Sequence, residues 1–195
     1  MKNGLVSVIL ALLLAGCSFN PFVIDGYAAP PAYDVEIVDK RSDAAKVGNS
    51  KHPLELARYH GDDMFIPGKL DLFRGALAQA FDSPPQQVAV LRFDVIDVPA
   101  KSVPSAQAAA MASISVAAAI AMDSAVGDSD YITCIIEAMV DGRLVRSSSF
   151  VYYELKATDT MIYNQPVYVA ALDKAVRESL DQWITNASLE AGAAQ

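Results

Sequence analysis

The chain has 195 residues with 53% hydrophobic and 19% charged residues, and its formal net charge is −8 at pH 7. This length allows one domain of ordinary size with flanking tails. A net negative charge repels nucleic acid and anionic lipid headgroups, so we expect no nucleic-acid partner. Two histidines and two cysteines leave little material for metal or acid–base chemistry.

The amino terminus carries the strongest motif. Lys2 precedes an apolar stretch from Leu5 to Leu14, and the string LAGC occupies positions 14–17. Such a stretch is too short to span a bilayer comfortably, and small residues before a cleavage point are typical of a signal peptide. The sequence therefore predicts a signal peptide over residues 1–16, and its removal takes the formal charge from −8 to −9.

The LAGC string resembles the lipobox of bacterial lipoproteins. That resemblance implies cleavage before Cys17, a diacylglycerol thioether on its sulfur, and palmitate or a similar acyl chain on the new amino group. Two or three acyl chains make a stable membrane anchor. Because Ser18 rather than Asp follows the cysteine, the resemblance also implies the outer membrane, at its periplasmic face, rather than the inner membrane. The alternative is an ordinary secretory signal in which the cysteine is accidental.

The first part of the mature chain is predicted to be a tether followed by a strand. Residues 17–32 contain three prolines and a glycine with little periodicity, which indicates a lipidated flexible tether. From Tyr33 to Val38 apolar and acidic residues alternate, which predicts a first strand and the start of a single periplasmic domain over 33–189.

Residues 42–66 are polar and irregular. Both histidines, His52 and His60, lie here with Asp62 and Asp63 nearby. Their spacing matches no recurrent set of metal ligands, so we expect solvent-exposed loop residues rather than a metal site.

A helix is predicted over 67–81, where apolar residues recur at three- and four-residue spacing. Its exposed side is expected to carry Lys69, Asp71, Arg74 and Gln79. Residues 88–98 are rich in β-forming residues and predict a strand. The segment from Ser102 to Met122 is uncharged and rich in alanine. For 105–122 we favour a packed helix over an extended segment or a membrane span, because alanine gains little from a bilayer.

A β-hairpin is the clearest local structure. Residues 130–140 and 143–155 flank Asp141-Gly142, a pair that suits a type I′ turn. A two-residue turn places Glu137 opposite Arg146. The same register predicts one apolar row in the core, and we expect the lone thiol of Cys134 to be buried within it. The row comprises Ile132, Cys134, Ile136, Ala138, Val140, Val145 and Val151.

The last element is a helix predicted over 166–189, with a frayed tail over 190–195. Its exposed side offers two pairs at i, i+4 spacing, Lys174 with Glu178 and Arg177 with Asp181. The predicted fold class is α+β, a mostly antiparallel sheet with the 67–81 and 166–189 helices packed on one face.

A weaker resemblance covers much of residues 33–185. A strand that ends in Val38 and Asp39, followed by Arg41 and Gly48, is similar to the uncharacterised outer-membrane lipoproteins of the YajG type. More distantly, the layout resembles the auxiliary lipoproteins of ABC-type envelope transporters. The resemblance implies no catalytic residues.

The function expected from the sequence is that of a non-catalytic, lipid-anchored accessory protein that binds another envelope protein. No nucleophile elbow, phosphate loop or cofactor motif is present, and the serines at 147–149 read as strand residues. The tyrosines at 152, 153, 163 and 168 are expected to pack rather than to form a contact surface. The alternatives are a periplasmic carrier or sensor of an apolar small molecule, and an unrecognised hydrolase.

Overall fold

The computed structural model describes residues 21–30, 33–47, 50–51, 57–99, 129–155 and 165–192. The predicted signal peptide, Cys17, Gly48 and the Ala-rich segment lie outside these residues. The elements, in chain order, are β1 (Phe22–Val23), β2 (Ile37–Asp39), α2 (Asp43–Lys46), β3 (Ser50–Lys51), β4 (Arg58–Tyr59), the 3₁₀ helix η1 (Asp62–Met64), β5 (Phe65–Ile66), α3 (Lys69–Ala80), β6 (Val88–Val98), β7 (Asp130–Val140), β8 (Arg143–Tyr153) and α6 (Pro166–Gly192). The predicted α+β class is confirmed.

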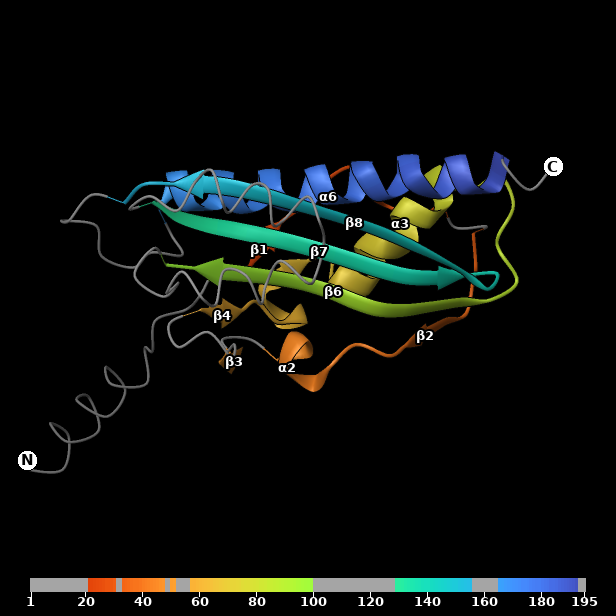
Figure 1. Cartoon of the computed structure of the whole chain (residues 1–195), viewed down its shortest axis with the longest axis horizontal. Helices are drawn as coiled ribbons and strands as arrows, with labels where there is room; N and C mark the ends of the chain where they lie inside the picture. The colour runs from red at the N-terminus through yellow and green to blue at the C-terminus, as the bar shows by residue number, and fades with distance from the viewer. Residues whose placement is uncertain are drawn as a thin grey trace, which may run out of the picture.

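Three long antiparallel strands, β6, β7 and β8, make up most of the main sheet (Figure 1). β4 pairs antiparallel with the last part of β6, and β3 pairs with β4. β2 pairs in parallel with the first part of β6, so the sheet is mixed. β1 and β5 form a separate two-stranded parallel sheet.

The predicted hairpin and its register are confirmed. Asp141 and Gly142 have φ angles of 48° and 81°, the left-handed conformation that a type I′ turn requires. Glu137 lies opposite Arg146, and their charged groups approach to 3.4 Å. The turn chemistry therefore sets which face of each strand enters the core.

The main core lies between the sheet and two helices. α6 contacts β7 and β8 along its length, and α3 contacts α6 (Figure 1). Phe73 of α3 meets Trp183 of α6 edge to face, with ring centroids 4.7 Å apart. The predicted apolar row, Cys134 included, is buried in this core. No helix within the described ranges is both long and apolar enough to cross a bilayer.

The first predicted strand is shorter than expected. β2 covers only Ile37–Asp39, because the parallel ladder with β6 begins where Ile37 meets Val88. Tyr33 and Val35 are nevertheless buried in the core. Their alternation reflects packing of an extended chain rather than strand pairing.

Residues 21–30, predicted as part of the flexible tether, belong to the folded body instead. Phe22, Ile24 and Tyr27 are each at most 5% exposed and lie in the main core. The tyrosine hydroxyl donates to Asp181 Oδ1 at 2.7 Å. This contact changes the helix surface: Arg177 pairs with Asp173 at 2.8 Å rather than with the predicted Asp181.

The other predicted pair on this helix, Lys174 with Glu178, is present at 3.7 Å. The two candidate pairs therefore differ in outcome because only one of them meets a competing partner from another part of the chain. A pattern within one helix does not show that partner.

Candidate functional site

Lys69, predicted on the exposed side of its helix, is fully buried. Its Nζ donates to the carbonyl oxygens of Ala45 at 2.6 Å, His60 at 2.7 Å and Phe93 at 3.1 Å. A carboxylate oxygen of Asp62 lies 3.6 Å away. Desolvation lowers the pKa of this lysine to about 8. The three hydrogen bonds connect Lys69, the first residue of α3, to the backbone at Ala45, His60 and Phe93.

Arg41 is a second buried cation beside this lysine. Its Nε donates to Asp39 Oδ1 at 2.9 Å and its Nη2 donates to Asp62 Oδ2 at 2.7 Å. Hydrogen bonds from the guanidinium hold the pKa of Asp39 below its usual range. The Asp39–Arg41 motif that carried the weaker family resemblance thus joins the end of β2 to η1.

His60 was predicted in a solvent-exposed loop, and this is wrong. The side chain is fully buried, and its ring stacks on Phe22 with centroids 5.7 Å apart. Its Nε2 lies 2.5 Å from the hydroxyl oxygen of Tyr168. Desolvation lowers the pKa of the imidazole to about 3, so the ring is neutral. The loop turns inward here because β4 has just paired with β6.

The hydrogen-bonded chain continues from Tyr168 to Asp97, which also accepts from the Tyr153 hydroxyl at 2.6 Å. Desolvation raises the pKa of this carboxyl group to about 6, and the nearby Asp130 adds to the rise. We call these four side chains, His60, Tyr168, Asp97 and Tyr153, the polar network. They come from the residue after β4, from α6, from β6 and from β8.

The polar network is the acid–base constellation that sequence patterns missed. The only signal in the sequence was Asp97, a carboxylate that interrupts the apolar run from Val95 to Val98. None of the four side chains is more than 7% exposed. All four side chains are therefore shielded from solvent and hydrogen-bonded within the core.

The serines at 147–149 connect β8 to α6. Ser149 Oγ donates to the carbonyl of Ala175 at 2.5 Å, and the hydroxyls of Ser147 and Ser179 lie 3.1 Å apart. The backbone N–H of Ser148 donates to the Gln182 side chain at 3.2 Å. Small hydroxyl side chains let the helix approach the outer strand closely.

The predicted candidate residues otherwise do not converge on one centre. Cys134 is fully buried, and burial raises the pKa of its thiol to about 12. Tyr153 is buried like Tyr168, whereas Tyr152 is partly exposed; His52 and Tyr163 lie outside the described residues. In the described part of the chain, no three His, Cys, Asp or Glu side chains are placed to hold a metal ion.

The face of the sheet turned away from α6 carries a charged row. Arg92, Glu137 and Arg146 lie side by side on β6, β7 and β8, so one carboxylate sits between two guanidinium groups. Arg92 also pairs with Asp94 at 2.6 Å. The next row toward the hairpin ends at Leu144, which is 40% exposed.

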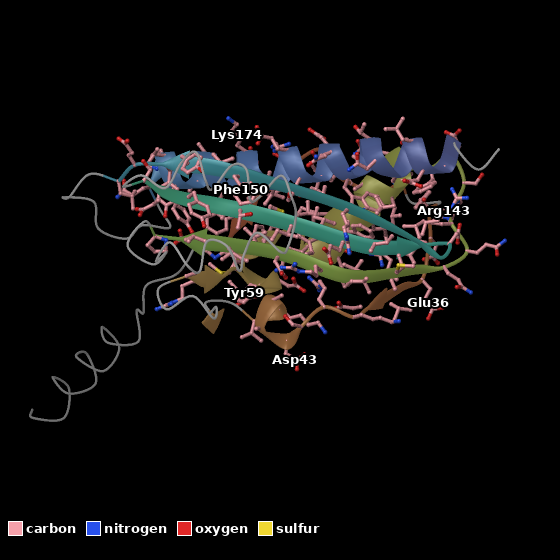
Figure 2. All side chains as sticks on the ribbon, in the orientation of Figure 1. Glu36, Asp43, Tyr59, Arg143, Phe150 and Lys174 are labelled. Atoms are coloured by element: carbon pink, nitrogen blue, oxygen red, sulfur yellow. The ribbon has the colours of Figure 1, made fainter. Side chains whose placement is uncertain are left out.

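A hollow of about 410 Å³ adjoins this row, between β2 and the start of β6. We call it the β2 hollow. Its lining comprises Glu36, Val38, Lys40, Gln86, Gln87, Val88, Ala89, Met139 and Gly142. Figure 2 shows Glu36 at the same end of the molecule as Arg143, where the hairpin turns. The hollow and the charged row form one mixed apolar and charged surface.

A second hollow, of about 280 Å³, lies between the hairpin and the carboxyl end of α6. We call it the hairpin hollow. Its lining comprises Phe81, Val140, Asp141, Arg143, Val145, Ala187, Glu190 and Ala191. Arg143 donates to the carbonyl of Glu190 across it. Its inner wall is apolar and its rim is charged.

Comparison of the chain with protein-family models, curated proteins and solved structures finds no match.

Proposed function

We propose that this protein is a lipid-anchored accessory protein of the bacterial cell envelope, without catalytic activity, that binds another envelope protein. The observation that carries the proposal is the LAGC string at 14–17. Its cysteine lies five positions before Phe22, the first buried core residue in the described part of the chain. Acyl chains on Cys17 would hold the folded body at the membrane surface. Ser18 after the cysteine favours the periplasmic face of the outer membrane.

The surface formed by the charged row and the β2 hollow supports a protein partner. Protein interfaces combine exposed apolar side chains with a polar rim, and here Val38 and Leu144 are 48% and 40% exposed beside paired charges. The alternation of Arg92, Glu137 and Arg146 gives this face a charge pattern that a complementary partner would recognise.

The absence of catalysis is proposed from the state of the titratable groups. Lys69 has its ammonium satisfied by backbone carbonyls, and Arg41 is held between two carboxylates. The polar network is buried together with its hydroxyl donors. These groups stabilise the fold where an enzyme would keep them open to a substrate.

The anchor is tested by mass spectrometry of the chain purified from membranes. We expect an amino-terminal Cys17 carrying two or three acyl chains, and Cys17→Ser should yield an unprocessed or soluble product. An unmodified start, or a leader still attached to the membrane form of the wild-type chain, would contradict the proposal.

The partner surface is tested by photo-crosslinking in cells. A crosslinking amino acid at position 144 should give a protein adduct of defined mass, whereas the same group at exposed position 174 on α6 should not. Arg146→Glu should remove the adduct at 144, because it reverses the charge next to Glu137. Equal adducts at both positions, or none at 144, would argue against this surface.

The hairpin hollow favours a second candidate function, carriage of an apolar small molecule. Its volume is close to the smallest ligand sites, and its inner wall is formed by Phe81, Val140, Val145 and Ala187. Native mass spectrometry that shows a bound lipid, lost in Ala187→Phe, would favour this function over the accessory role.

A further inference from the structure

The β1–β5 sheet has one side in the core and one side in solvent. Phe22 and Phe65 are paired, only 3% and 4% exposed, and their ring centroids lie 5.7 Å apart. The next pair along the ladder, Val23 and Ile66, is 58% and 53% exposed. Two β-branched apolar side chains therefore stand together on the outside. We propose that this pair, the outer pair, rests on the lipid surface of the membrane that holds the anchor.

This inference depends on the proposed lipidation, because the chain between anchor and body is short. Five residues lie between Cys17 and Val23, so their Cα atoms are six residue steps apart. An extended chain spans at most about 3.3–3.6 Å per residue, so the valine lies within roughly 20 Å of the acylated sulfur. Phe22 is fixed in the core and cannot lengthen this connection. The side of the body that carries β1 must therefore stay close to the bilayer.

The chemistry around the outer pair suits a lipid surface. The two short stretches that form the sheet, 21–24 and 65–68, carry no charged residue. The protein as a whole is acidic and is repelled by anionic headgroups, so its point of closest approach should be uncharged and apolar. Apolar side chains next to a lipid anchor lower the free energy of the body at the interface.

The experiment uses the mature chain, purified from membranes and shown by mass spectrometry to begin at an acylated Cys17. An environment-sensitive fluorophore is attached through Val23→Cys or Ile66→Cys, with Leu189→Cys as the matched control. Leu189 is 68% exposed and lies near the carboxyl end of α6, whereas Phe22 of β1 contacts Tyr168 near the start of this helix. Cys134 does not compete for the label in the native protein, because it is fully buried.

The labelled proteins are reconstituted into phosphatidylcholine vesicles with brominated acyl chains. We expect about threefold stronger quenching at 23 and 66 than at 189, because interfacial apolar groups lie ~5–10 Å deep in the boundary between headgroups and acyl chains. Far-UV circular dichroism checks that each labelled chain is folded.

Two results would overturn the inference and leave the anchor intact. Equal quenching at 23, 66 and 189 in acylated protein would show that the outer pair does not touch lipid. A blue-shifted emission at 23 and 66 without bromolipid quenching would assign this side to contact with a second copy of the chain. An unacylated Cys17 would instead refute the proposed function and remove the premise of the inference.

Discussion

Two residues of the polar network, His60 and Asp97, give the folding stability opposite responses to pH. The pKa of His60 falls from 6.5 to about 3 on folding, so its contribution is present above pH 6.5 and is lost as the pH falls. The pKa of Asp97 rises from 3.8 to about 6, so its contribution is present below pH 4 and is lost as the pH rises through 6.

Asp97→Asn should therefore change how stability depends on pH. One pKa unit corresponds to about 1.4 kcal/mol. The ionisation of Asp97 alone therefore lowers the free energy of unfolding of the wild type by about 3 kcal/mol between pH 4 and pH 8. In the variant that loss should disappear, and the free energy of unfolding should gain about 3 kcal/mol between pH 4 and 8 relative to wild type. Urea titrations over this range measure it.

A matched pair of variants controls this result. Asp71→Asn changes an exposed carboxylate and should leave the pH profile as it is in the wild type. His60→Gln keeps a polar group near the Tyr168 hydroxyl and should remove the loss of stability below pH 6.5. A pH profile for Asp97→Asn that coincides with that of wild type would contradict the assigned environment of the carboxyl group.

Residue types predicted burial well only where they were apolar. The row containing Cys134 and Ile136 was predicted correctly from alternation and turn chemistry. Lys69 and His60 were assigned to solvent because their side chains are polar, yet both are buried. Their partners, such as the carbonyl of Phe93 for the lysine, are distant in sequence, and no local pattern shows them.

At the scale of elements, the length of a strand determined whether the sequence predicted it. The eleven-residue strands β6, β7 and β8 each contain enough alternation or β-forming residues to be predicted within a few positions. Alternation predicted β2 as part of a longer strand, but only Ile37–Asp39 pairs with β6. β1 and β5 have two residues each and pair in parallel across a long stretch of sequence. Such strands exist because the tertiary structure brings their partners together, and periodicity does not reveal them.

The contact between α3 and the amino-terminal segment depends on one glycine. A Cβ atom at Gly75 would lie 1.5 Å from the carbonyl oxygen of Tyr27, so the two backbones touch. Gly75→Ala should force them apart and lower the free energy of unfolding by about 1–3 kcal/mol, as overpacking of a core does. Chemical denaturation measures the loss, and protease cleavage within 21–30 should become faster.

Gly192→Ala is the control, because nothing lies within 4 Å of a Cβ atom there. It should leave both stability and cleavage unchanged. If Gly75→Ala behaved in the same way, the segment around Tyr27 would not be held against α3 in solution.

At the scale of the whole molecule, the amino-terminal segment determines where the folded body begins. The sequence predicted a tether as far as residue 32, because prolines and a glycine suggested a flexible chain. The structure instead places Phe22, Ile24 and Tyr27 in the main core, against α3, β5 and α6. The apolar residues in this segment follow no helical or strand period, which is why their burial was not predicted.

Truncation tests whether residues 18–27 are a flexible linker or part of the folded body. In chains without the lipid anchor, a protein that begins at Pro21 should match one that begins at Ser18, whereas a protein that begins at Ala28 loses three buried side chains. Each contributes about 1.5–3 kcal/mol, so the total approaches the 5–15 kcal/mol that stabilises a typical domain. Thermal unfolding followed by circular dichroism should show the shortest chain largely unfolded. An unchanged midpoint for the chain that begins at Ala28 would mean that residues 18–27 are a flexible linker. The anchor would then not hold β1 near the bilayer.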